Sequence, residues 1–533
     1  MNAAGRAAGA RFQRIDLALV LGVLGSAAWL VSAGARVIQE DGFYYLEIAR
    51  NVAGGRGSTF DGLHATNGYQ PLWLACLVPL FWMRPSAEAA MAAVILLQAA
   101  LLSAATVLVV RLARESGLPA GAAAIAGCVW VGLTARTALS GVEFALTAAL
   151  VSAVALRLKR HAARVPETRA CAAMGLLLGL ALLARLDTSL LALLVIAEWG
   201  ARLRRAPGGG ARITALGAPT VVLAAGYAVA NEILFGHPWP VSGAAKRLWS
   251  LHLLEADTVH QAHGWLAAKA WHLTWPLRHP LAAAMPAVIV GGLLAGALLW
   301  IGEGRRTWRA LGPVRDVLRG LRPLVAFAGL QLVAYVAAYH GHYTYAPWYY
   351  VAQPLLAALV AGAAAHALVD AVRARAQAAA LLTASAVLLA GLGAAGGLRR
   401  ASWDEPLYVA ARWARDHLEP GARLGSWNAG AISFLSGRQV VNLDGVVNSF
   451  AYLERDQYDL CGYWDRTGIT YLVDVFEARE GSSAMKGTSL PVSAFYAACA
   501  DRLQIVWSEP QAGNPGWPKA VRITSPTGPP PAP

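Results

Sequence analysis

Two neighbouring acids, Glu40 and Asp41, directly follow the first apolar segment of the chain, where a lipid–water boundary is expected. Charge next to a membrane span is costly unless a site uses it. If residues 40–52 form a helix, Tyr44 and Tyr45 share a face with Asp41. A carboxylate beside aromatic rings and lipid loses hydration, which suits a general base, and phenol rings can stack on a sugar.

An interfacial aromatic belt is the alternative explanation, since tyrosine and tryptophan favour the membrane surface. Such a belt explains Tyr44 and Tyr45 but not the paired acids. We therefore predict that Asp41 is catalytic. Glu40 points about 100° away on a helix and is the weaker catalytic candidate.

The loop that follows is rich in glycine between Gly54 and Gly68 and carries His64, Asn67 and Tyr69. Glycine lets a backbone approach a ligand closely, and loops often carry binding residues. We predict that these three side chains bind substrate. A plain surface loop is an equal alternative for each of them.

Three later motifs add charged and polar side chains: Ser-Gly-Val-Glu with Glu143, Ala-Arg-Leu-Asp with Arg185 and Asp187, and Pro-Val-Ser-Gly-Ala-Ala-Lys with Ser242 and Lys246. A guanidinium fork and a lysine suit a phosphate, so Arg185 and Lys246 are predicted phosphate ligands. Each charge also has a simpler explanation. Glu143 could cap a helix, Arg185 could only pair with Asp187, and Lys246 could snorkel.

Two further groups of polar residues carry weaker signals. His340 and His342 are compatible with a metal pair, a headgroup contact or a proton donor, although an ordinary interfacial histidine is the preferred interpretation. Asn442, Asp444 and Asn448 stand at the end of an expected strand. A turn formed by Asp-Gly is the preferred interpretation there, and contact with an acceptor is the alternative.

The composition says which elements must position these residues. The chain has 533 residues, 57% hydrophobic and 14% charged, with a mean hydropathy of +0.45, which is not the composition of a soluble globular protein. Its net charge of +14 comes from arginines clustered between apolar segments, as in cytoplasmic loops. No basic–aromatic module is present, so nucleic-acid binding is excluded.

The fold class predicted from this pattern is a polytopic α-helical membrane protein of about eleven spans with a C-terminal extracytoplasmic α/β domain. If 71–83 lies at the interface and does not span, every strongly basic loop falls in the cytoplasm. Residues 16–34 resemble a signal peptide, but their length favours an uncleaved span. The expected spans are 16–34, 87–110, 119–136, 142–158, 170–184, 187–201, 212–235, 279–301, 323–340, 347–369 and 377–397.

Three parts of the chain follow from these spans. Residues 1–398 form the membrane domain, in which 36–85 is the first extracytoplasmic loop with juxtamembrane helices. Residues 399–525 form the extracytoplasmic α/β domain, and 526–533 are a proline-rich disordered tail. The N-terminus is then cytoplasmic and the C-terminal domain exported. A disulfide between Cys461 and Cys499 is permitted there, at even odds.

With this topology, the acidic pair, SGVE, ARLD, PVSGAAK and the segment HGHYTYAPWYY all lie on one side of the membrane. In this order, the motifs resemble the GT-C superfamily of polytopic glycosyltransferases that use polyprenyl-phosphate sugars. Within it they are most similar to the branch of the mycobacterial terminal β-(1→2)-arabinofuranosyltransferase. Two departures are Glu40 where that pattern has a first aspartate, and Leu186 where relatives often carry proline.

The resemblance implies inverting sugar transfer from a polyprenyl-phosphate donor at the bacterial inner membrane, with Asp41 as the base. The acceptor hydroxyl could belong to a glycan, a lipid or a protein. No cofactor is certain, and a divalent metal stays open. The main rival is a transporter or flippase of a lipid-linked or anionic substrate, which would place polar groups near mid-bilayer and often show repeats.

Overall fold

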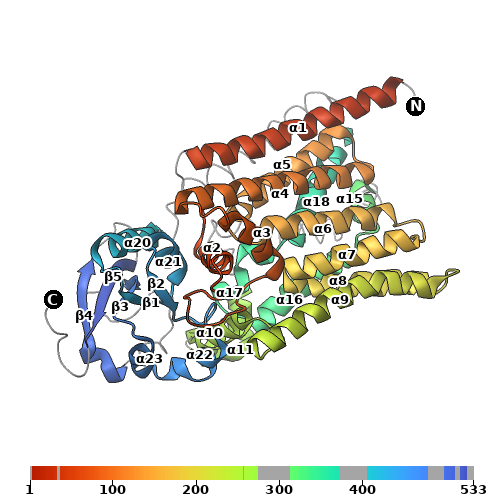
Figure 1. The fold of residues 1–533 in the computed structure, drawn as a ribbon. Coiled ribbons are helices and arrows are strands. Elements are labelled where there is room, and N and C mark those ends of the chain that lie inside the picture. Colours follow the sequence, from red (N-terminus) through yellow and green to blue (C-terminus); the bar gives the residue numbers. More distant parts are fainter. Residues whose placement is uncertain are drawn as a thin grey trace.

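The computed structural model describes residues 3–32, 37–255, 257–273, 312–371, 405–477, 497–509 and 516–524. Long helices lie side by side in one part of the molecule, and a small sheet with its own helices forms the other (Figure 1). The N-terminal end of α1 lies far from the sheet, and several short helices fill the junction between the two parts (Figure 1).

Nine of the eleven expected spans coincide with a long helix. These helices are α1 (Ala3–Ser32), α4 (Ala87–Glu115), α5 (Ala120–Ala138), α6 (Phe144–Arg160), α7 (Thr168–Ala184), α8 (Ser189–Leu203), α9 (Gly209–Phe235), α16 (Arg322–Ala338) and α18 (Ala352–Ala371). The spans expected at 279–301 and 377–397 lie outside the described residues.

The count of eleven spans is not confirmed. Among the described residues, three helices (α4, α5 and α9) are long and apolar enough to cross a membrane by themselves. A fourth span results if α16 is joined to α15 (Gly312–Leu318), which is bent from it by 86°. The others are shorter or less apolar, and α7 and α8 have only 17 and 15 residues.

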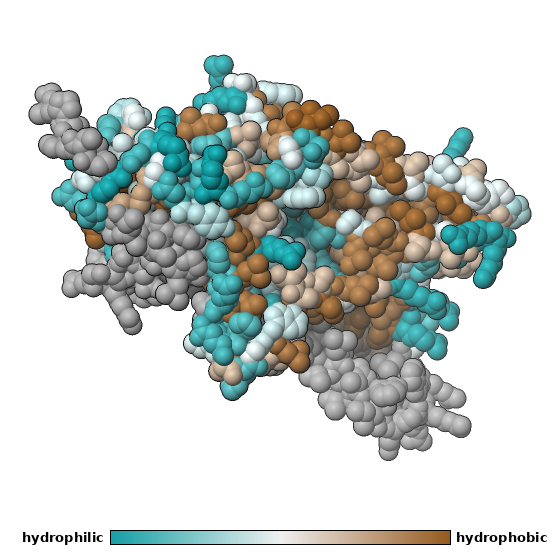
Figure 2. Space-filling model, turned by 90° about the horizontal axis from the view of Figure 1, so that it is seen from below, coloured by the Kyte–Doolittle hydropathy of each residue, from teal (hydrophilic) through white to brown (hydrophobic). Residues whose placement is uncertain are grey.

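The outer faces of the long helices are apolar, as a lipid-facing surface requires. On α9, Val222, Ile233 and Leu234 are 68%, 77% and 66% exposed. Figure 2 shows hydrophobic residues gathered in a band across the helices, with hydrophilic residues on the C-terminal domain and at the opposite helix ends. The molecule therefore has the surface of a multi-pass membrane protein.

The basic loops between the helices meet at the helix ends opposite the C-terminal domain. Arg160 at the end of α6 pairs with Glu115 at the end of α4, with 2.6 Å between the closest nitrogen and oxygen. Lys159 donates to the carbonyl of Arg319 after α15 at 3.1 Å. Arg202, near the end of α8, donates to the carbonyl of His161 at 2.8 Å. This clustering agrees with the predicted basic side of the protein.

The junction contains α2 (Glu40–Ala53), α3 (Pro71–Phe81), η1 (Leu186–Thr188), α10 (Val241–Glu255), α11 (Thr258–Leu273), α17 (His342–Tyr345) and η2 (Pro347–Tyr349). The helix expected at 40–52 is confirmed. Helix α3 has 11 residues and reaches about 16 Å, too short to span a bilayer, which agrees with the interfacial interpretation of 71–83. The segment before Lys246, expected to be a loop, is helical from Val241 onward.

The C-terminal domain contains a five-stranded sheet of order β2-β1-β3-β5-β4, in which β1 is parallel to β2 and β3 and the other pairs are antiparallel. Its elements are α20 (Glu405–His417), β1 (Arg423–Ser426), α21 (Ala429–Ser436), β2 (Gln439–Asn442), α22 (Phe450–Glu454), η3 (Asp456–Tyr458), α23 (Leu460–Thr467), β3 (Tyr471–Glu477), η4 (Ala497–Arg502), β4 (Leu503–Ser508) and β5 (Gly516–Ile523). From the sequence, ARLGSW, RQVVNL and ITYLVDV are expected to be strands and EPLYVAARWARDHL a helix, and β1, β2, β3 and α20 confirm these expectations. Cys461 and Cys499 form a disulfide.

The C-terminal domain docks on α2 through the carboxyl ends of its parallel strands, where α/β folds commonly place binding sites. Tyr44 on α2 donates its hydroxyl to the carbonyl of Trp427, just after β1, at 3.2 Å. It also lies 3.4 Å from the amide nitrogen of Asn442 at the end of β2. On the same side, Tyr408 of α20 donates to the carbonyl of Ile38 at 3.2 Å.

Candidate active site

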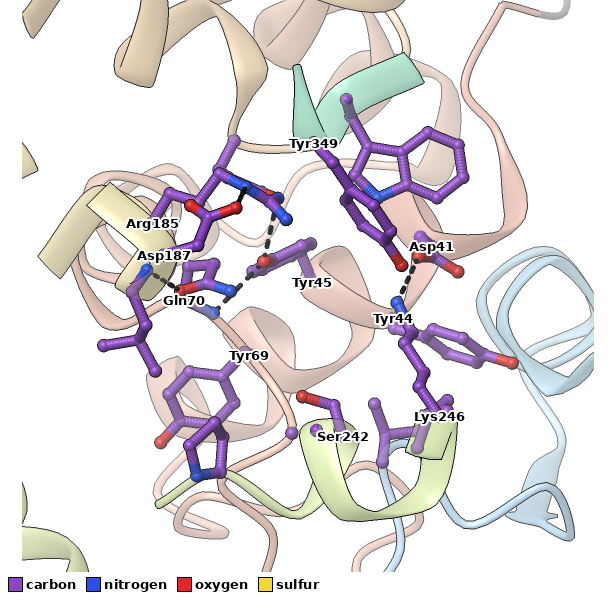
Figure 3. Close-up of a pocket in the computed structure, with 18 of the residues that line it drawn as sticks. Asp41, Tyr44, Tyr45, Tyr69, Gln70, Arg185, Asp187, Ser242, Lys246 and Tyr349 are labelled. Carbon is purple, nitrogen blue, oxygen red and sulfur yellow. Dashed lines mark hydrogen bonds and ion pairs between the residues drawn. The ribbon is translucent and has the colours of Figure 1, made fainter. Parts of the chain in front are cut away.

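A cavity of about 220 Å³ lies where α2, α10, η1, α16 and η2 meet the loop after β2 (Figure 3). Its wall combines carboxylates, cations and tyrosines in one small space. It is lined by Asp41, Tyr44, Tyr45, Ile48, Gly68, Tyr69, Gln70, Glu143, Arg185, Leu186, Asp187, Pro240, Ser242, Gly243, Lys246, Tyr335, Tyr339, Trp348, Tyr349, Val446 and Val447. The sequence motifs around Asp41, Glu143, Arg185 and Lys246 therefore converge on one cavity.

Asp41 and Lys246 form an ion pair across one end of this cavity, with 3.2 Å between the Asp41 Oδ2 and the Lys246 Nζ (Figure 3). The two side chains are 29% and 21% exposed, so a ligand in the cavity can reach both. Burial is the largest single influence and disfavours the charge on Lys246, but Asp41, together with Tyr349 and Glu143, outweighs it, so the lysine pKa is raised. Lys246 is therefore a permanent cation held beside the proposed base.

Arg185 is the centre of a second charged group. It pairs with Glu143 and, at 3.1 Å, with Asp187, and its guanidinium lies 4.6 Å from the centre of the Tyr349 ring. Arg185 does pair with Asp187, as the simpler explanation requires. That explanation is incomplete, because Arg185 also pairs with Glu143, which lies 42 residues earlier in the chain. Arg185, Glu143 and Asp187 therefore stabilise one another's charges.

Asp187 carries one oxygen that the described residues leave without a hydrogen bond. Its Oδ2 accepts from Tyr335 at 2.7 Å and from Gln331 at 2.9 Å, whereas its buried Oδ1 has no partner among the described residues. The bonded oxygen thus ties Asp187 to Tyr335 and Gln331 of α16 as well as to Arg185.

Tyr45 joins α2, the helix that carries Asp41, to Glu143 of the second charged group. Tyr45 donates to the Glu143 carboxylate at 3.0 Å and accepts from the backbone N–H of Gln70 at 3.1 Å. Glu143 stands just before α6, but its side chain makes no capping hydrogen bond to that helix. Its carboxylate serves Tyr45 and Arg185, which argues against the helix-cap explanation.

Glu40 points away from the cavity, as its position on the helix predicts. Its carboxylate accepts the backbone N–H groups of Gly430 and Ala431 at the start of α21, the latter at 3.0 Å. An anion is favoured at a helix N-terminus. In this structure Glu40 joins α2 to the C-terminal domain, and its predicted role in catalysis has no geometric support.

The remaining predicted residues divide between cavity and scaffold. Tyr69 and Ser242 line the cavity. Asn67 does not; it accepts from the Val241 N–H at 2.9 Å and donates to the Trp239 carbonyl at 3.0 Å, which fixes the start of α10. His64 lies 2.6 Å from Asp61 and 3.5 Å from the Tyr463 hydroxyl, outside the lining.

His340, the first histidine of the HGHYTYAPWYY segment, does not enter the described site. His340 is buried against Asp257, with 3.0 Å between its Nε2 and the carboxylate, and it does not line the cavity. The side chain of His342 lies outside the described residues. Within the described ranges, no three His, Cys, Asp or Glu side chains come together as a metal site requires.

Sequence reasoning missed an aromatic wall. Tyr335, Tyr339, Trp348 and Tyr349 all line the cavity, and the rings of Tyr335 and Tyr349 stack with 4.8 Å between centroids. The signal was present in the run APWYY, but aromatic residues are common at membrane interfaces and single ones carry little information. Gln70, Val446 and Val447 were missed as well.

Comparison with known proteins separates the two parts of the chain. A family model described as a domain of unknown function (DUF8728) matches residues 399–515, which is the C-terminal domain. No curated protein matches the sequence. The family match covers less than half of the chain and carries no activity.

The membrane helices and the C-terminal domain together match the fold of a solved structure along nearly its whole length. The likeness is to ArnT from Cupriavidus metallidurans bound to undecaprenyl phosphate, with a TM-score of 0.53 and 15% identity, covering 99% of this chain and 100% of that chain. For the structure of the same protein in the apo state, the TM-score is 0.53 and the identity 14%, covering 97% of this chain and 98% of that chain. The predicted architecture, a helical membrane part with a C-terminal α/β domain, is thereby confirmed, whereas membership of the GT-C superfamily stays a prediction.

A weaker likeness is to the oligosaccharyltransferase AglB from Archaeoglobus fulgidus, in complex with an inhibitory peptide and a dolichol-phosphate. Its TM-score is 0.42 at 14% identity, over 86% of this chain and 69% of that chain. At such identities a likeness shows the fold alone, and this one adds no argument. The arabinofuranosyltransferase branch stays a prediction.

Proposed function

We propose that this protein is an inverting glycosyltransferase that moves a sugar from a polyprenyl-phosphate donor to an acceptor hydroxyl on the extracytoplasmic side of the bacterial inner membrane. The observation that carries the proposal is the Asp41–Lys246 pair, a carboxylate and a permanent cation sharing one cavity with Arg185. A glycosyl transfer from a phosphate donor needs these two kinds of group at neighbouring places.

In the proposed reaction, Asp41 takes the proton of the acceptor hydroxyl as its oxygen attacks the anomeric carbon. The bond between that carbon and the phosphate oxygen breaks, and the polyprenyl phosphate leaves with the electron pair. Lys246 and Arg185 stabilise the departing anion. A single displacement of this kind inverts the anomeric centre.

The ion pair suggests an order of binding. Without donor, Lys246 occupies the Asp41 carboxylate at 3.2 Å. A donor phosphate competes for Lys246, and its arrival releases Asp41 to accept a proton. The ArnT structure with undecaprenyl phosphate supports a lipid phosphate as the ligand of such a fold, at the level of fold likeness.

The test offers a panel of undecaprenyl-phosphate sugars to purified protein and measures released undecaprenyl phosphate. Wild-type protein should release it from at least one donor, and Asp41→Asn should lower the rate by about 10²- to 10⁴-fold, the usual range for removing a general base. Glu88→Gln, an exposed acid in the first turn of α4, is the matched control and should leave the rate unchanged.

The same experiment separates the enzyme from its rival. A transporter or flippase would move lipid-linked substrate between leaflets without breaking its glycosidic bond. Flipping of intact donor by an Asp41→Asn variant at the wild-type rate, with no release by either protein, would refute sugar transfer.

A further inference from the structure

Beside the cavity stands a second carboxylate, Asp444, that the proposed reaction has not used. It belongs to the loop between β2 and α22, whose Val446 and Val447 form part of the cavity wall. The loop turns at Gly445, which has a φ of +82°, a conformation that favours glycine. The loop that carries Asp444 therefore forms part of the cavity rim, where the C-terminal domain meets the catalytic helices, although Asp444 itself is not among the lining residues.

This loop is held firmly on both sides. Trp249 of α10, one turn after Lys246, donates its ring N–H to the Asp444 carbonyl at 2.6 Å. Asn448 donates to the Asn442 carbonyl at 2.6 Å, and Tyr452 to the Leu443 carbonyl at 2.5 Å. The rim is thus fixed to the same helix that carries the phosphate ligand.

The Asp444 side chain does more than form a turn. Its Oδ1 accepts the Val446 N–H at 2.9 Å, an arrangement that asparagine makes equally well. No cation among the described residues forms an ion pair with it, and a partly buried carboxylate without one is costly. An ionised carboxylate accepts a hydrogen bond more strongly than an amide would at this turn, so Asp444 offers a strong acceptor beside the site.

The surroundings of Asp444 connect it to the reaction. Burial raises the pKa of Asp444 to about 7, against the hydrogen bonds from Val446 and Asn442; the charge of Asp41 raises it further, and that of Lys246 lowers it. Tyr44 of α2, Tyr343 of α17 and Tyr452 of α22 are further titratable groups close enough to interact with it. Asp444 thus shares the electrostatic environment of the Asp41–Lys246 pair.

The cavity is too small to enclose both reactants, so we expect the acceptor to bind at the rim. About 220 Å³ is below the roughly 300–1,000 Å³ of sites that enclose drug-sized ligands. A donor sugar beside Lys246 and Arg185 leaves little room for an acceptor. The acceptor must then meet the donor at an edge of the cavity, and the loop that carries Asp444 forms the edge on the side of the C-terminal domain.

We propose that Asp444 binds a second hydroxyl of the acceptor, next to the one that Asp41 deprotonates, so that the enzyme selects a polyhydroxylated acceptor, a sugar. This inference rests on the proposed function and specifies its acceptor class. The hydroxyl keeps its proton and donates to the Asp444 carboxylate. Among glycan, lipid and protein acceptors, it selects the glycan.

The test is a thermodynamic cycle of the double-mutant type: one hydroxyl is removed from the acceptor, the charge of Asp444 is removed from the protein, and the two changes are made singly and together. Octyl glycosides serve as acceptors with the best donor of the panel, and each is compared with its monodeoxy analogues. In wild-type protein, one deoxy analogue should lose about tenfold in kcat/KM, the usual effect of a hydrogen bond to a charged group. In Asp444→Asn the same analogue should lose little.

Two further readouts separate this role from a purely structural one. The wild-type kcat/KM for acceptor should rise with pH through about 7, as Asp444 ionises, and the rise should be absent in Asp444→Asn. Binding of undecaprenyl phosphate should be the same in both proteins. Asp459→Asn, an exposed acid of the same domain, is the matched control and should change none of these.

Stability gives an independent check. The pKa of Asp444 is raised above its ordinary value of 3.8, so its ionisation costs folding free energy; this cost is full above pH 7 and declines as the pH falls toward 4. Asp444→Asn should therefore raise Tm at about pH 8, and less at about pH 5, while lowering activity.

An equal deoxy penalty in wild type and Asp444→Asn would overturn the inference, as would equal rates with a glycoside and with octanol. If wild-type protein releases no undecaprenyl phosphate from any donor, the proposed function itself fails. The two failures are therefore distinguishable.

Discussion

At the scale of single residues, the ion pair between Asp41 and Lys246 joins the two halves of the proposed reaction. One member takes a proton from the acceptor, and the other holds the phosphate of the donor. Their 3.2 Å contact means that each controls the availability of the other. A lysine suits this exchange because its charge is a point on a flexible chain.

Replacing Lys246 by methionine nearly keeps the length of the side chain and removes its charge. We expect Lys246→Met to weaken binding of undecaprenyl phosphate by about 10- to 100-fold, the usual effect of losing a hydrogen bond to a charged group. The measurement is the rise in Tm with added undecaprenyl phosphate, which follows the affinity. Arg247→Met, the neighbouring cation on α10 that does not line the cavity, is the control.

The charged residues of the site could be found from the sequence because charge is rare in an apolar chain. Asp41, Arg185 and Lys246 stood out for that reason and do converge. Tyr349 could not be distinguished from an interfacial aromatic residue. The partner of Glu40 could not be found either, since Gly430 lies 390 residues later and only the fold brings them together.

At the scale of elements, α2 is held between the membrane helices and the C-terminal domain. Tyr45 faces Glu143 of the membrane part, whereas Glu40 binds the start of α21. The position of Asp41 between these two contacts is therefore fixed from both sides. The regular period of the sequence predicted the helix, but the contacts at its two ends depend on packing.

A glycine in α21 makes this contact possible. A Cβ on Gly430 would lie 2.7 Å from the Glu40 carbonyl oxygen and 2.8 Å from its carboxylate. We expect Gly430→Ala to weaken docking of the C-terminal domain, seen as a lower Tm and faster proteolysis before residue 405. Gly421→Ala, where a Cβ meets nothing within 4 Å, should behave like wild type. Equal stability of the two variants would contradict the proposed contact.

The strands of the C-terminal domain were predictable only in part. β1, β2 and β3 are short apolar runs between turn residues, which is the usual strand signal. β5 was missed; it contains Pro518, and proline weakens the expectation of a strand. β4 lies at the edge of the sheet and pairs with β5 through an irregular register, which no local pattern reveals.

At the scale of the whole molecule, the polar site and the basic helix ends lie at opposite ends of the long helices. Arg160 and Arg202 belong to the end near α15, and Asp41 to the end that contacts the C-terminal domain. By the positive-inside rule, we propose that the cavity and the C-terminal domain face the extracytoplasmic side. The sequence predicted this polarity, since loop charge and span order are local properties.

The cysteines test this orientation without any substrate. Cys461 and Cys499 are bonded, whereas Cys76, Cys128 and Cys171 are free. Disulfides persist outside the cytoplasm and are rare inside it. Protein denatured without reductant should take up three maleimide–polyethylene glycol groups, and all five should react after reduction. The sample is protein from intact cells whose thiols are trapped with acid. If all five cysteines react before reduction, the C-terminal domain lies in the cytoplasm, and the proposed site lies there with it.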